Sequence, residues 1–401
     1  MQKNAQDIVL VMVNGFDSPG ITAKLTSIIA SAQGVHILDI EQTVVHKKLI
    51  LSILLKFNQG RNEKTSVLKE LLFCGNEFGV KVGFEAFSHQ LLDGSHHYRY
   101  AITCLGKEVD AKPLSQISAV LAKRKVNIAK ISKLAQKNLS CVELLVESKR
   151  RLNYRDFSKE LLALTAELSV DIAMQPADLS RRAKRMVVMD MDSTLVSTEA
   201  IDELARAAGK YKQVQAITKQ AMNGKLDFNR SLQRRVALLK GLPEKSLEKA
   251  VKNMQLNRGA KRLIKVLNHL GYHIGVVSGG FTQFTDHLAK TLKLDFSFAN
   301  QLEIKAGKLT GNVTGTIINA EGKARILESM AKSRGISTDQ VIAIGDGAND
   351  LQMLSCAGMG IAFHAKDIVR KQAHTTIGKH AGLDSILYLL GISEHELKGM
   401  V

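Results

Sequence analysis

The sequence contains no tryptophan, and aromatic residues of all kinds make up only 5% of its 401 residues. Hydrophobic residues still account for 45% of the chain, so aliphatic side chains must do most of the packing. The length is enough for two or three domains of ordinary size. We therefore expect a globular protein of more than one domain whose cores are built mainly from aliphatic residues.

Long apolar runs and cysteine patterns are also missing. No stretch is long and apolar enough to form a bilayer-spanning helix, so we expect no membrane partner. The N-terminus, MQKNAQDIVLVMVNG, lacks the order of basic, apolar and small-residue regions that marks a signal peptide. The cysteines show no CxxC spacing, which favours reduced, structural thiols in a cytoplasmic protein. They are Cys74, Cys104, Cys141 and Cys356.

Acidic residues are few relative to basic ones. The sequence has 38 Asp and Glu residues and 56 Lys and Arg residues, which gives a net charge of +18. Such an excess is one sign of nucleic-acid binding. Basic clusters occur at 148–155 (SKRRLNYR) and 180–185 (SRRAKR). No aromatic-interleaved recognition motif or zinc-finger spacing accompanies them. We favour a solvated basic surface that helps to attract anionic substrates, and we expect no nucleic-acid partner.

The first part of the chain contains one pattern twice. Runs typical of strands and helices follow the order βαββαβ over residues 1–90, and a similar order recurs over residues 91–178. A tandem duplication at this length favours two small α+β domains rather than a solenoid. The polar and basic segment from about residue 176 to residue 185 then fits a linker.

The pattern of apolar residues changes in the third part, residues 186–401, where short apolar runs alternate with long helical stretches. This alternation predicts a doubly wound α/β domain, with a parallel sheet and helices on both faces. Polar residues end three of the apolar runs: Asp190, Ser278 and Asp346. Because ligands of such sheets gather at the carboxyl ends of the strands, we expect these three residues to share one crevice.

The first of these strand ends carries the motif DMDST, with Asp190, Asp192 and Thr194 at alternate positions. In an extended segment alternate residues face the same side, so the three side chains are expected to converge on one ligand. Asp190 is placed to attack phosphorus and form an acyl phosphate. Asp192 is placed to protonate the leaving oxygen and then to deprotonate water. For an isolated DxD pattern, a capping pair or a surface turn is an equal alternative.

A second acidic motif, GDGAND at 345–350, places Asp346 and Asp350 in a glycine-rich turn. Such hard oxygen ligands suit Mg²⁺, although an Asp-Gly turn with a helix cap is the alternative. A phosphate beside these acids also needs a fixed cation, and Lys323 in EGKARIL is the candidate. Ser278 and Gly279 offer further donors at a helix N-terminus. An exposed lysine and a plain strand-to-helix turn are the alternatives for these groups.

Taken together and in order, DMDSTLVSTE, VVSGG, EGKAR and GDGAND resemble the motifs of the haloacid dehalogenase-like phosphatases. The segment ITKQAMNGKLDFNRSLQRRVALLKGL, residues 217–242, is similar to the cap segment of the phosphoserine phosphatases within that family. The resemblance covers residues 186 to about 395 and implies a helical cap at about 199–262. It also implies Mg²⁺-dependent hydrolysis of O-phospho-L-serine to serine and phosphate, the last step of serine biosynthesis. A phosphatase or phosphotransferase for another small phosphate, such as phosphohomoserine, remains the alternative within the class.

The resemblance implies a role for each matching residue of the catalytic and metal sites. Asp190 would be the phosphorylated nucleophile and Asp192 the general acid and base. Asp190, the backbone carbonyl of Asp192 and Asp346 would hold Mg²⁺, with Asp350 supporting the metal site from behind. The phosphate would be held by Ser278, Gly279 and Lys323, with Asn349 nearby.

The resemblance also implies how the rest of the substrate is bound. Glu199 would meet the substrate ammonium group, and Arg235 would bind its carboxylate, for which a guanidinium is well suited. Met222 and Phe228 would close apolar surface over the substrate. Without the resemblance, exposed helical charges and packing within the cap are the simpler interpretations of these four residues.

The two N-terminal repeats resemble ACT domains, small modules that often bind amino acids at interfaces. NGFDSPGIT (14–22) matches the turn where such ligands dock, and a scaffold turn is an equal alternative. The resemblance implies serine as a regulatory ligand and a homodimer, with amino-acid sensing as the rival main function. The second repeat has EVDAKP at this place, so we expect it to serve dimerisation only. The candidate ligand residues of the first repeat are Asn14, Gly15, Asp17 and Gly20.

Overall fold

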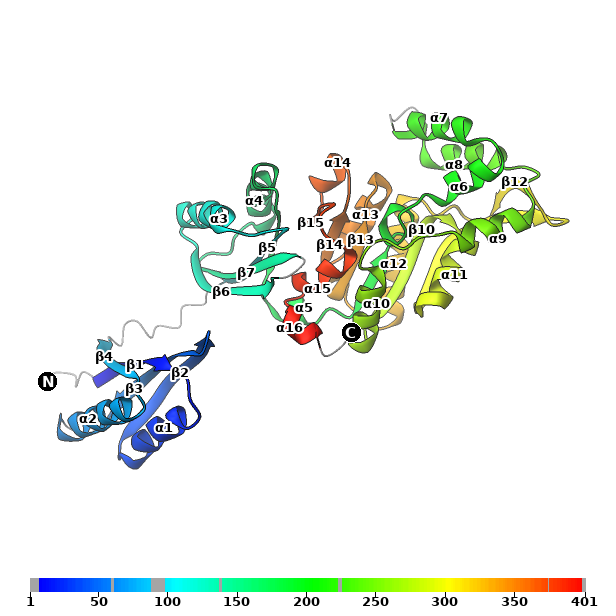
Figure 1. The fold of residues 1–401 in the computed structure, drawn as a ribbon. Helices are drawn as coiled ribbons and strands as arrows, with labels where there is room; N and C mark the ends of the chain where they lie inside the picture. Colours follow the sequence, from blue (N-terminus) through cyan, green and yellow to red (C-terminus); the bar gives the residue numbers. More distant parts are fainter. Residues whose placement is uncertain are drawn as a thin grey trace. The chain divides into compact units, whose positions relative to one another are not determined.

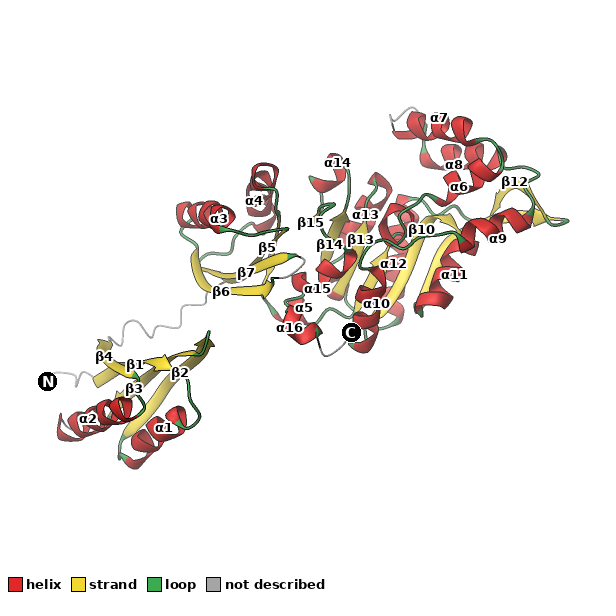
Figure 2. Ribbon diagram, viewed as in Figure 1, coloured by secondary structure: helices red, strands yellow, loops and turns green. Residues whose placement is uncertain are grey.

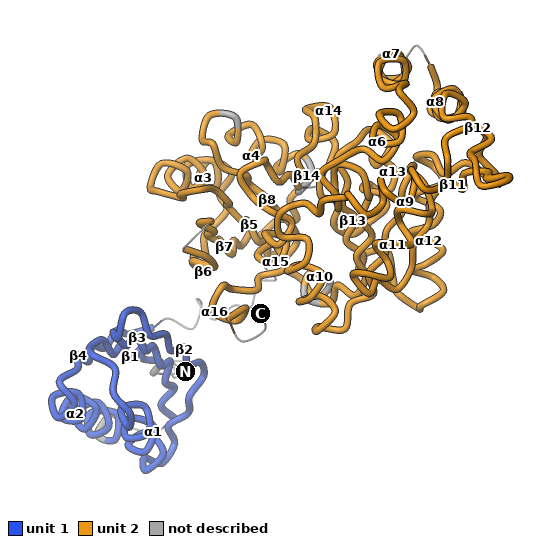
Figure 3. The backbone as a smooth tube through the Cα atoms, turned by 45° about the vertical axis from the view of Figure 1, so that its right-hand side comes forward, with its two compact units in different colours: residues 1–96 blue, residues 97–401 orange. Residues whose placement is uncertain are grey.

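The computed structural model of the chain (Figure 1) describes six stretches of residues. They form two compact units, residues 1–96 and residues 97–401 (Figure 3). Among the described residues, no helix is long and apolar enough to cross a membrane. The described stretches are 7–58, 61–87, 98–136, 139–222, 226–373 and 375–398.

The first unit is an antiparallel sheet with two helices on one side (Figure 2). Its elements are β1 Asp7–Phe16, α1 Ile21–Ser31, β2 Val35–Val45, β3 Lys48–Phe57, α2 Arg61–Glu77 and β4 Lys81–Phe87. The strands lie in the order β2-β3-β1-β4. Val9, Val11 and Val13 alternate along β1 and are buried under the helices with Leu25 and Leu71. The predicted βαββαβ order is therefore confirmed for this repeat.

The second repeat has the same topology, strand for strand. Its elements are β5 Tyr98–Gly106, α3 Ala111–Lys123, β6 Asn127–Ala135, β7 Ser140–Ser148, α4 Tyr154–Leu168 and β8 Asp171–Pro176. Its strands lie in the order β6-β7-β5-β8. The EVDAKP segment forms a helix cap, because the Asp110 side chain accepts a hydrogen bond from the Lys112 backbone N–H at the start of α3. The two repeats therefore differ in sequence at the start of their first helix.

The third part of the chain is built on a sheet whose strands are parallel except for one. Its described strands are β9 Met186–Met189, β10 His273–Phe281, β11 Phe296–Lys305, β12 Lys308–Thr314, β13 Val341–Gly345, β14 Met359–Phe363 and β15 Thr375–Ile377. They lie in the order β12-β11-β10-β9-β13-β14-β15, and β12 is antiparallel to β11. Met189 of β9 pairs with Val276 on one side and with Ile344 on the other, which brings the ends of three strands level.

Helices cover both faces of this sheet, as predicted. The described helices are α10 Ala260–His269, α11 Thr282–Leu292, α12 Ala320–Ser333, α13 Leu351–Cys356, α14 Asp367–Arg370, α15 Ile386–Leu389 and α16 Glu394–Leu397. Val187 and Met189 belong to one buried cluster, together with α10, α11 and α15. Met186 and Val188 belong to the opposite cluster, together with α12 and α13. β9 is thus buried on both faces, which explains its uninterrupted apolar sequence.

The cap lies between β9 and β10 in the sequence and consists of helices. They are α6 Ala200–Ala207, α7 Tyr211–Met222, α8 Phe228–Ala237 and α9 Glu244–Lys252. The loop between α8 and α9 pairs with β12 through two backbone hydrogen bonds. One runs from Gly241 N–H to Leu309 O (2.8 Å) and the other from Leu309 N–H to Leu242 O (2.9 Å). The β11–β12 hairpin, which the sequence analysis did not predict, therefore supports the base of the cap.

The segment predicted to be a linker is a packed connection with a short helix, α5 Leu179–Arg182. Arg181 is buried and forms an ion pair with Glu143 of β7. Lys184 is also buried, and its ammonium group donates a hydrogen bond to the backbone carbonyl of Asp339. Part of the basic cluster at 180–185 is therefore structural, and does not belong to the solvated basic surface that we expected.

The second repeat packs against the edge strand β15 of the large sheet. In β8, the Asp171 carboxylate accepts a hydrogen bond from Gly378 N–H at 2.7 Å. The same carboxylate lies 3.0 Å from Nε2 of His380, and this contact raises the pKa of the imidazole. Leu139 and Cys141 of this repeat lie in the same buried cluster as Val187 and Met189 of β9. The unit 97–401 is therefore continuous across this interface.

Candidate active site

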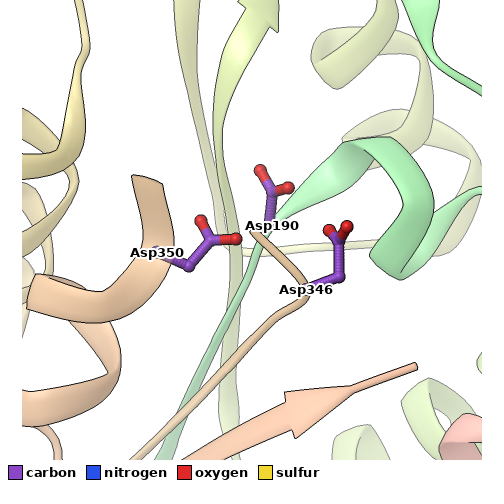
Figure 4. Close-up of side chains that lie close together, drawn as sticks. All are labelled: Asp190, Asp346 and Asp350. Atoms are coloured by element: carbon purple, nitrogen blue, oxygen red, sulfur yellow. The ribbon is translucent and has the colours of Figure 1, made fainter. Parts of the chain in front are cut away.

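Three carboxylates meet at the carboxyl ends of two neighbouring strands (Figure 4). Asp190 directly follows β9, Asp346 follows β13, and Asp350 ends the short turn Ala348–Asp350. One oxygen of each carboxylate lies within 4.8 Å of the others. β9 lies between β10 and β13, so the cluster sits where the connections leave the sheet in opposite directions, the usual ligand site of such sheets.

Lys323 supplies the cation beside these acids. It projects from α12 and is fully buried, so it is not an ordinary exposed lysine. Its Nζ lies 2.6 Å from Oδ1 of Asp190 and 2.6 Å from Oδ1 of Asp350. Burial acts to lower the pKa of Lys323, but the two carboxylates outweigh it and raise the pKa above its ordinary value. Lys323 therefore carries its charge at all ordinary pH values.

When all of them are ionised, the carboxylates of the cluster carry more negative charge than Lys323 can balance. Burial raises the pKa of Asp190 well above its usual range, and the Asp350 carboxylate adds to this effect. Burial and the Glu199 carboxylate do the same to the pKa of Asp192. Burial, helped by Asp350 and Glu199, raises the pKa of Asp346 to about 7. Each of these shifts shows that a further positive charge would be favourable here, and carboxylate oxygens are the ligands that a hard divalent cation prefers.

The chain after Asp190 is not extended, contrary to our expectation for DMDST. Residues Met191–Leu195 form a tight turn, called the catalytic turn below, in which Ser193 has a left-handed backbone (φ 58°, ψ −6°). The turn nevertheless keeps the side chains near the cluster. Thr194 Oγ1 donates to Asp346 Oδ1 at 3.1 Å, and Asp192 Oδ1 accepts from Ala200 N–H at 2.7 Å. The residues come together through a turn rather than through strand alternation.

The end of β10 approaches the same place. Ser278 is buried, and its Oγ accepts a hydrogen bond from Gly280 N–H at 2.8 Å. A Cβ atom on Gly280 would lie 2.8 Å from Oδ2 of Asp192, and one on Gly279 would lie 2.8 Å from Cζ of Phe228. The paired glycines therefore let the catalytic turn and the cap approach this backbone closely.

Asn300 in β11 fixes this glycine loop and was not predicted. Its Nδ2 donates to the carbonyl of Gly279 at 2.9 Å, and its Oδ1 accepts from the N–H of Ile318 at 2.8 Å. The side chain is buried, at 2% exposure. The only sign in the sequence is the pair of amides Asn300 and Gln301 in FSFANQL, which is too weak to single out a residue.

The cap brings charged residues to the cluster. Glu199 immediately precedes α6, and its Oε1 accepts a hydrogen bond from Ser193 Oγ at 2.9 Å. Burial lowers the pKa of Arg235 in α8, although the nearby carboxylates of Glu199, Asp202 and Asp192 counteract it. Glu199 thus lies beside the turn, and Arg235 is near enough to these carboxylates for their charge to affect its pKa. Asp202 is an addition that the sequence analysis did not identify.

The remaining predicted site residues differ in how they are placed. Phe228, the first residue of α8, touches the Gly279 position, so the cap lies over the end of β10. Asn349 lies in the turn before Asp350, with its Oδ1 beside Gly347. The side chain of Met222 is outside the described residues.

The local structure requires glycine at two positions of the predicted amino-acid site in the first repeat. A Cβ atom on Gly15 would lie 2.5 Å from Cγ1 of Val80, so this glycine allows β1 to pack. Gly20 precedes α1 with φ 101°, a conformation that favours glycine. Asn14 and Asp17 are exposed and remain available to a ligand.

Comparisons with known families divide the chain in the same way. Residues 187–355 match the haloacid dehalogenase-like hydrolase family. Residues 7–85 match an ACT domain, and residues 96–175 match a second ACT domain.

Two curated relatives align with nearly the whole chain. The chain is 41% identical over 391 residues to the phosphoserine phosphatase of Streptomyces coelicolor, which covers 97% of this chain and 93% of that protein. It is 38% identical over 390 residues to the phosphoserine phosphatase SerB2 of Mycobacterium tuberculosis, covering 97% and 94%.

Solved structures are also similar. A haloacid dehalogenase family hydrolase from Salmonella enterica serovar Typhi superposes with a TM-score of 0.64 at 34% identity, over 72% of this chain and 98% of that one. A probable phosphoserine phosphatase from Vibrio cholerae superposes with a TM-score of 0.58 at 31% identity, over 75% and 89%. With the acidic cluster, the capped sheet and two N-terminal repeats in place, the chain belongs to the phosphoserine phosphatase family of haloacid dehalogenase-like hydrolases, in the form that carries two ACT domains.

Proposed function

We propose that this chain is a phosphatase that hydrolyses O-phospho-L-serine to L-serine and phosphate in the final step of serine biosynthesis. The observation that carries the proposal is the buried Asp190–Lys323 pair beneath a cap that presents Glu199 and Arg235. The names of the full-length relatives support it. The proposed domains are residues 1–90 and 91–178 for the ACT domains and residues 186–401 for the phosphatase, with the cap at about 199–262.

We propose that the cluster takes Mg²⁺. Asp190, Asp346 and the backbone carbonyl of Asp192 would hold the ion, and Asp350 would support the site from behind while it binds Lys323. The fit rests on the donor set, which is made of carboxylates that outnumber the one buried cation beside them. When bound, the ion would neutralise charge on the phosphate and on the transition state of its transfer.

In the first chemical step a carboxylate oxygen of Asp190 attacks phosphorus, and the bond from phosphorus to the serine oxygen breaks. Lys323 holds Oδ1 of Asp190 and so fixes the orientation of the nucleophile. Asp192 donates a proton to the leaving serine oxygen, and its raised pKa helps it to carry that proton. Ser278 and Gly279 hold the phosphate from the end of β10, with Asn349 nearby.

In the second step the enzyme releases the phosphate. Asp192, now deprotonated, takes a proton from a water molecule, whose oxygen attacks the phosphorus of the phosphorylated Asp190. The bond from phosphorus to the Asp190 oxygen breaks, which restores the carboxylate and frees inorganic phosphate. One carboxyl group thus serves as acid in the first step and as base in the second.

Substrate choice is assigned to the cap. Glu199, held by Ser193, would meet the ammonium group, and Arg235 would bind the carboxylate. Met222 and Phe228 would cover the short carbon chain between them. A substrate that lacks either charge would leave Glu199 or Arg235 unpaired in a site closed by the cap, which is unfavourable.

A panel of phosphomonoesters tests this function. With Mg²⁺ present, we expect kcat/KM for phosphoserine to exceed that for p-nitrophenyl phosphate or phosphohomoserine by at least about 10-fold, because both end charges are paired only at the correct length. Phosphate release is measured for each substrate under the same conditions. A preference for phosphohomoserine, or no preference at all, would refute the assignment of substrate.

We propose that serine also acts as a regulatory ligand at Asn14, Gly15, Asp17 and Gly20 of the first ACT domain in a homodimer. The exposed Asn14 and Asp17 side chains support it. Calorimetric titration of serine into the full chain should show a binding event that the Asp17→Ala variant loses, since the carboxylate would pair with the amine. Light scattering should give the mass of a dimer. Equal serine binding by both proteins would count against this site.

A further inference from the structure

The chain returns from the cap to the core between α9 and α10, and one residue of this segment contacts the turn after Asp190. We infer that Asn257, which lies between α9 and α10, is a positioning residue that holds the catalytic turn after Asp190 in its active shape. The inference deepens the proposed function, on which it rests, and it adds a residue that belongs to none of the four sequence motifs.

The side chain of Asn257 is surrounded by backbone carbonyls of the turn. Its Nδ2 lies 3.1 Å from the carbonyl oxygen of Ser193, 2.8 Å from that of Thr194 and 3.2 Å from that of Val196. All three neighbours are acceptors, so the atom between them must be a donor. An amide meets this need, whereas the carboxylate of an aspartate with the same shape would repel all three oxygens.

The backbone strengthens this link between two distant segments. Asn257 N–H donates to Leu195 O at 3.0 Å, and Ser197 N–H donates to Gln255 O at 2.9 Å. The two segments that connect the cap to the core are therefore tied side by side, with Val196 bridged to Leu256. The amide of Asn257 ties the turn itself to these segments.

The turn needs such support because its conformation is unfavourable. Ser193 adopts a left-handed backbone, which is strained for a residue that has a side chain. The three contacts from Asn257 help to hold the turn in this unfavourable conformation.

A shift of the turn would disturb two functions together. The hydroxyl of Ser193 holds Glu199, the proposed partner of the substrate ammonium. The hydroxyl of Thr194 holds Asp346, a proposed metal ligand. Loss of the amide donor should therefore weaken both the Mg²⁺ response and the catalytic rate, and a residue that served only to stabilise the fold would not change the Mg²⁺ response.

The test compares Asn257→Asp with the wild-type full chain. We expect kcat to fall about 10- to 100-fold, the size of effect that a small misplacement of reacting groups produces. The Mg²⁺ concentration for half-maximal activity should rise severalfold at the same time. Asn257→Ser keeps one hydroxyl donor and should fall between the two proteins. Asn253→Asp makes the same change of charge at an exposed position in the same segment and should match the wild type.

The assay is run on phosphoserine and on p-nitrophenyl phosphate so that two failures are distinguished. A wild-type protein that cleaves only the second compound would refute the proposed function, while the Asn257 comparison would continue on that compound. Wild-type kcat and Mg²⁺ response in Asn257→Asp would overturn the inference. If Asn257→Asp does not fold, Asn257→Ser decides in the same way: a lower kcat with a raised Mg²⁺ requirement supports the role, and wild-type values reject it.

Discussion

Replacing Asp190 with Asn is expected to reduce turnover of phosphoserine by at least about 10⁴-fold, the scale seen when a covalent enzyme loses its nucleophile. The same change should remove any covalently phosphorylated form of the enzyme. The amide has the shape of the carboxylate but lacks its nucleophilic oxygen. Both outcomes follow from one assignment, that the bond to phosphorus is made by a carboxylate oxygen of this residue.

The Asp190→Asn variant should fold, so its loss of turnover would come from the missing nucleophile and not from unfolding. In the wild type, Lys323 bridges two buried carboxylates at 2.6 Å each. With Asn at position 190 the lysine still faces Asp350, so no buried charge is left without a partner. Removing one of several crowded carboxylates also relieves repulsion, because burial and Asp350 already raise the pKa of Asp190. We expect thermal stability equal to or above that of the wild type.

Rapid mixing with radiolabelled phosphoserine, followed by acid quenching, measures both predicted losses in one experiment. Wild-type protein should retain label during turnover, and Asp190→Asn should retain none. The control is Asp367→Asn, whose carboxylate is 89% exposed at the start of α14 and which is none of the predicted site residues. An Asp190→Asn protein that keeps more than about 1% of wild-type turnover would contradict nucleophilic catalysis by this residue.

The catalytic aspartates could be predicted from the sequence because charged side chains are unfavourable at the ends of buried apolar strands. Asp190 and Asp346 follow strands that are buried on both faces, where an unpaired carboxylate is costly. Polar residues at such places indicate a ligand site, and the parallel sheet then brings them together. Lys323 was harder to predict, because only its burial in the structure separates it from an ordinary helical lysine.

The residues that support the site could not be found in the same way. Asn257 and Asn300 act through backbone carbonyls that are distant in sequence, so no local spacing identifies them. The extended geometry that we expected for Asp192 and Thr194 was wrong because Ser193 takes a left-handed turn. A serine has no strong preference for that conformation, and contacts made elsewhere impose it.

The second large effect is expected for Lys323→Met, which removes the buried cation and keeps an unbranched apolar chain. Activity should fall about 10²- to 10³-fold, the usual cost of losing one group that stabilises charge in a transition state. The metal-free protein should also lose about 3–5 kcal/mol of unfolding free energy, because breaking a buried ion pair leaves charge without a partner. Here two carboxylates, Asp190 and Asp350, lose their common partner.

Mg²⁺ should restore much of the stability of Lys323→Met and little of its activity. An ion held by the cluster compensates the same carboxylates, and binding to the native state alone raises stability in proportion to the logarithm of ligand concentration. The ion cannot replace the ammonium group that orients Asp190 Oδ1 and holds the phosphate. Stability and activity should therefore separate in this variant, although both depend on charge in one small site.

Chemical denaturation with and without Mg²⁺, beside phosphate-release assays, checks this separation. The matched control is Lys332→Met, which removes a positive charge from an exposed position of the same helix and should change the unfolding free energy by no more than about 0.5 kcal/mol. If Lys323→Met were as stable as the wild type without metal, the carboxyl groups that Lys323 contacts would be neutral in the folded variant, and the charge-balancing role of Lys323 would be refuted.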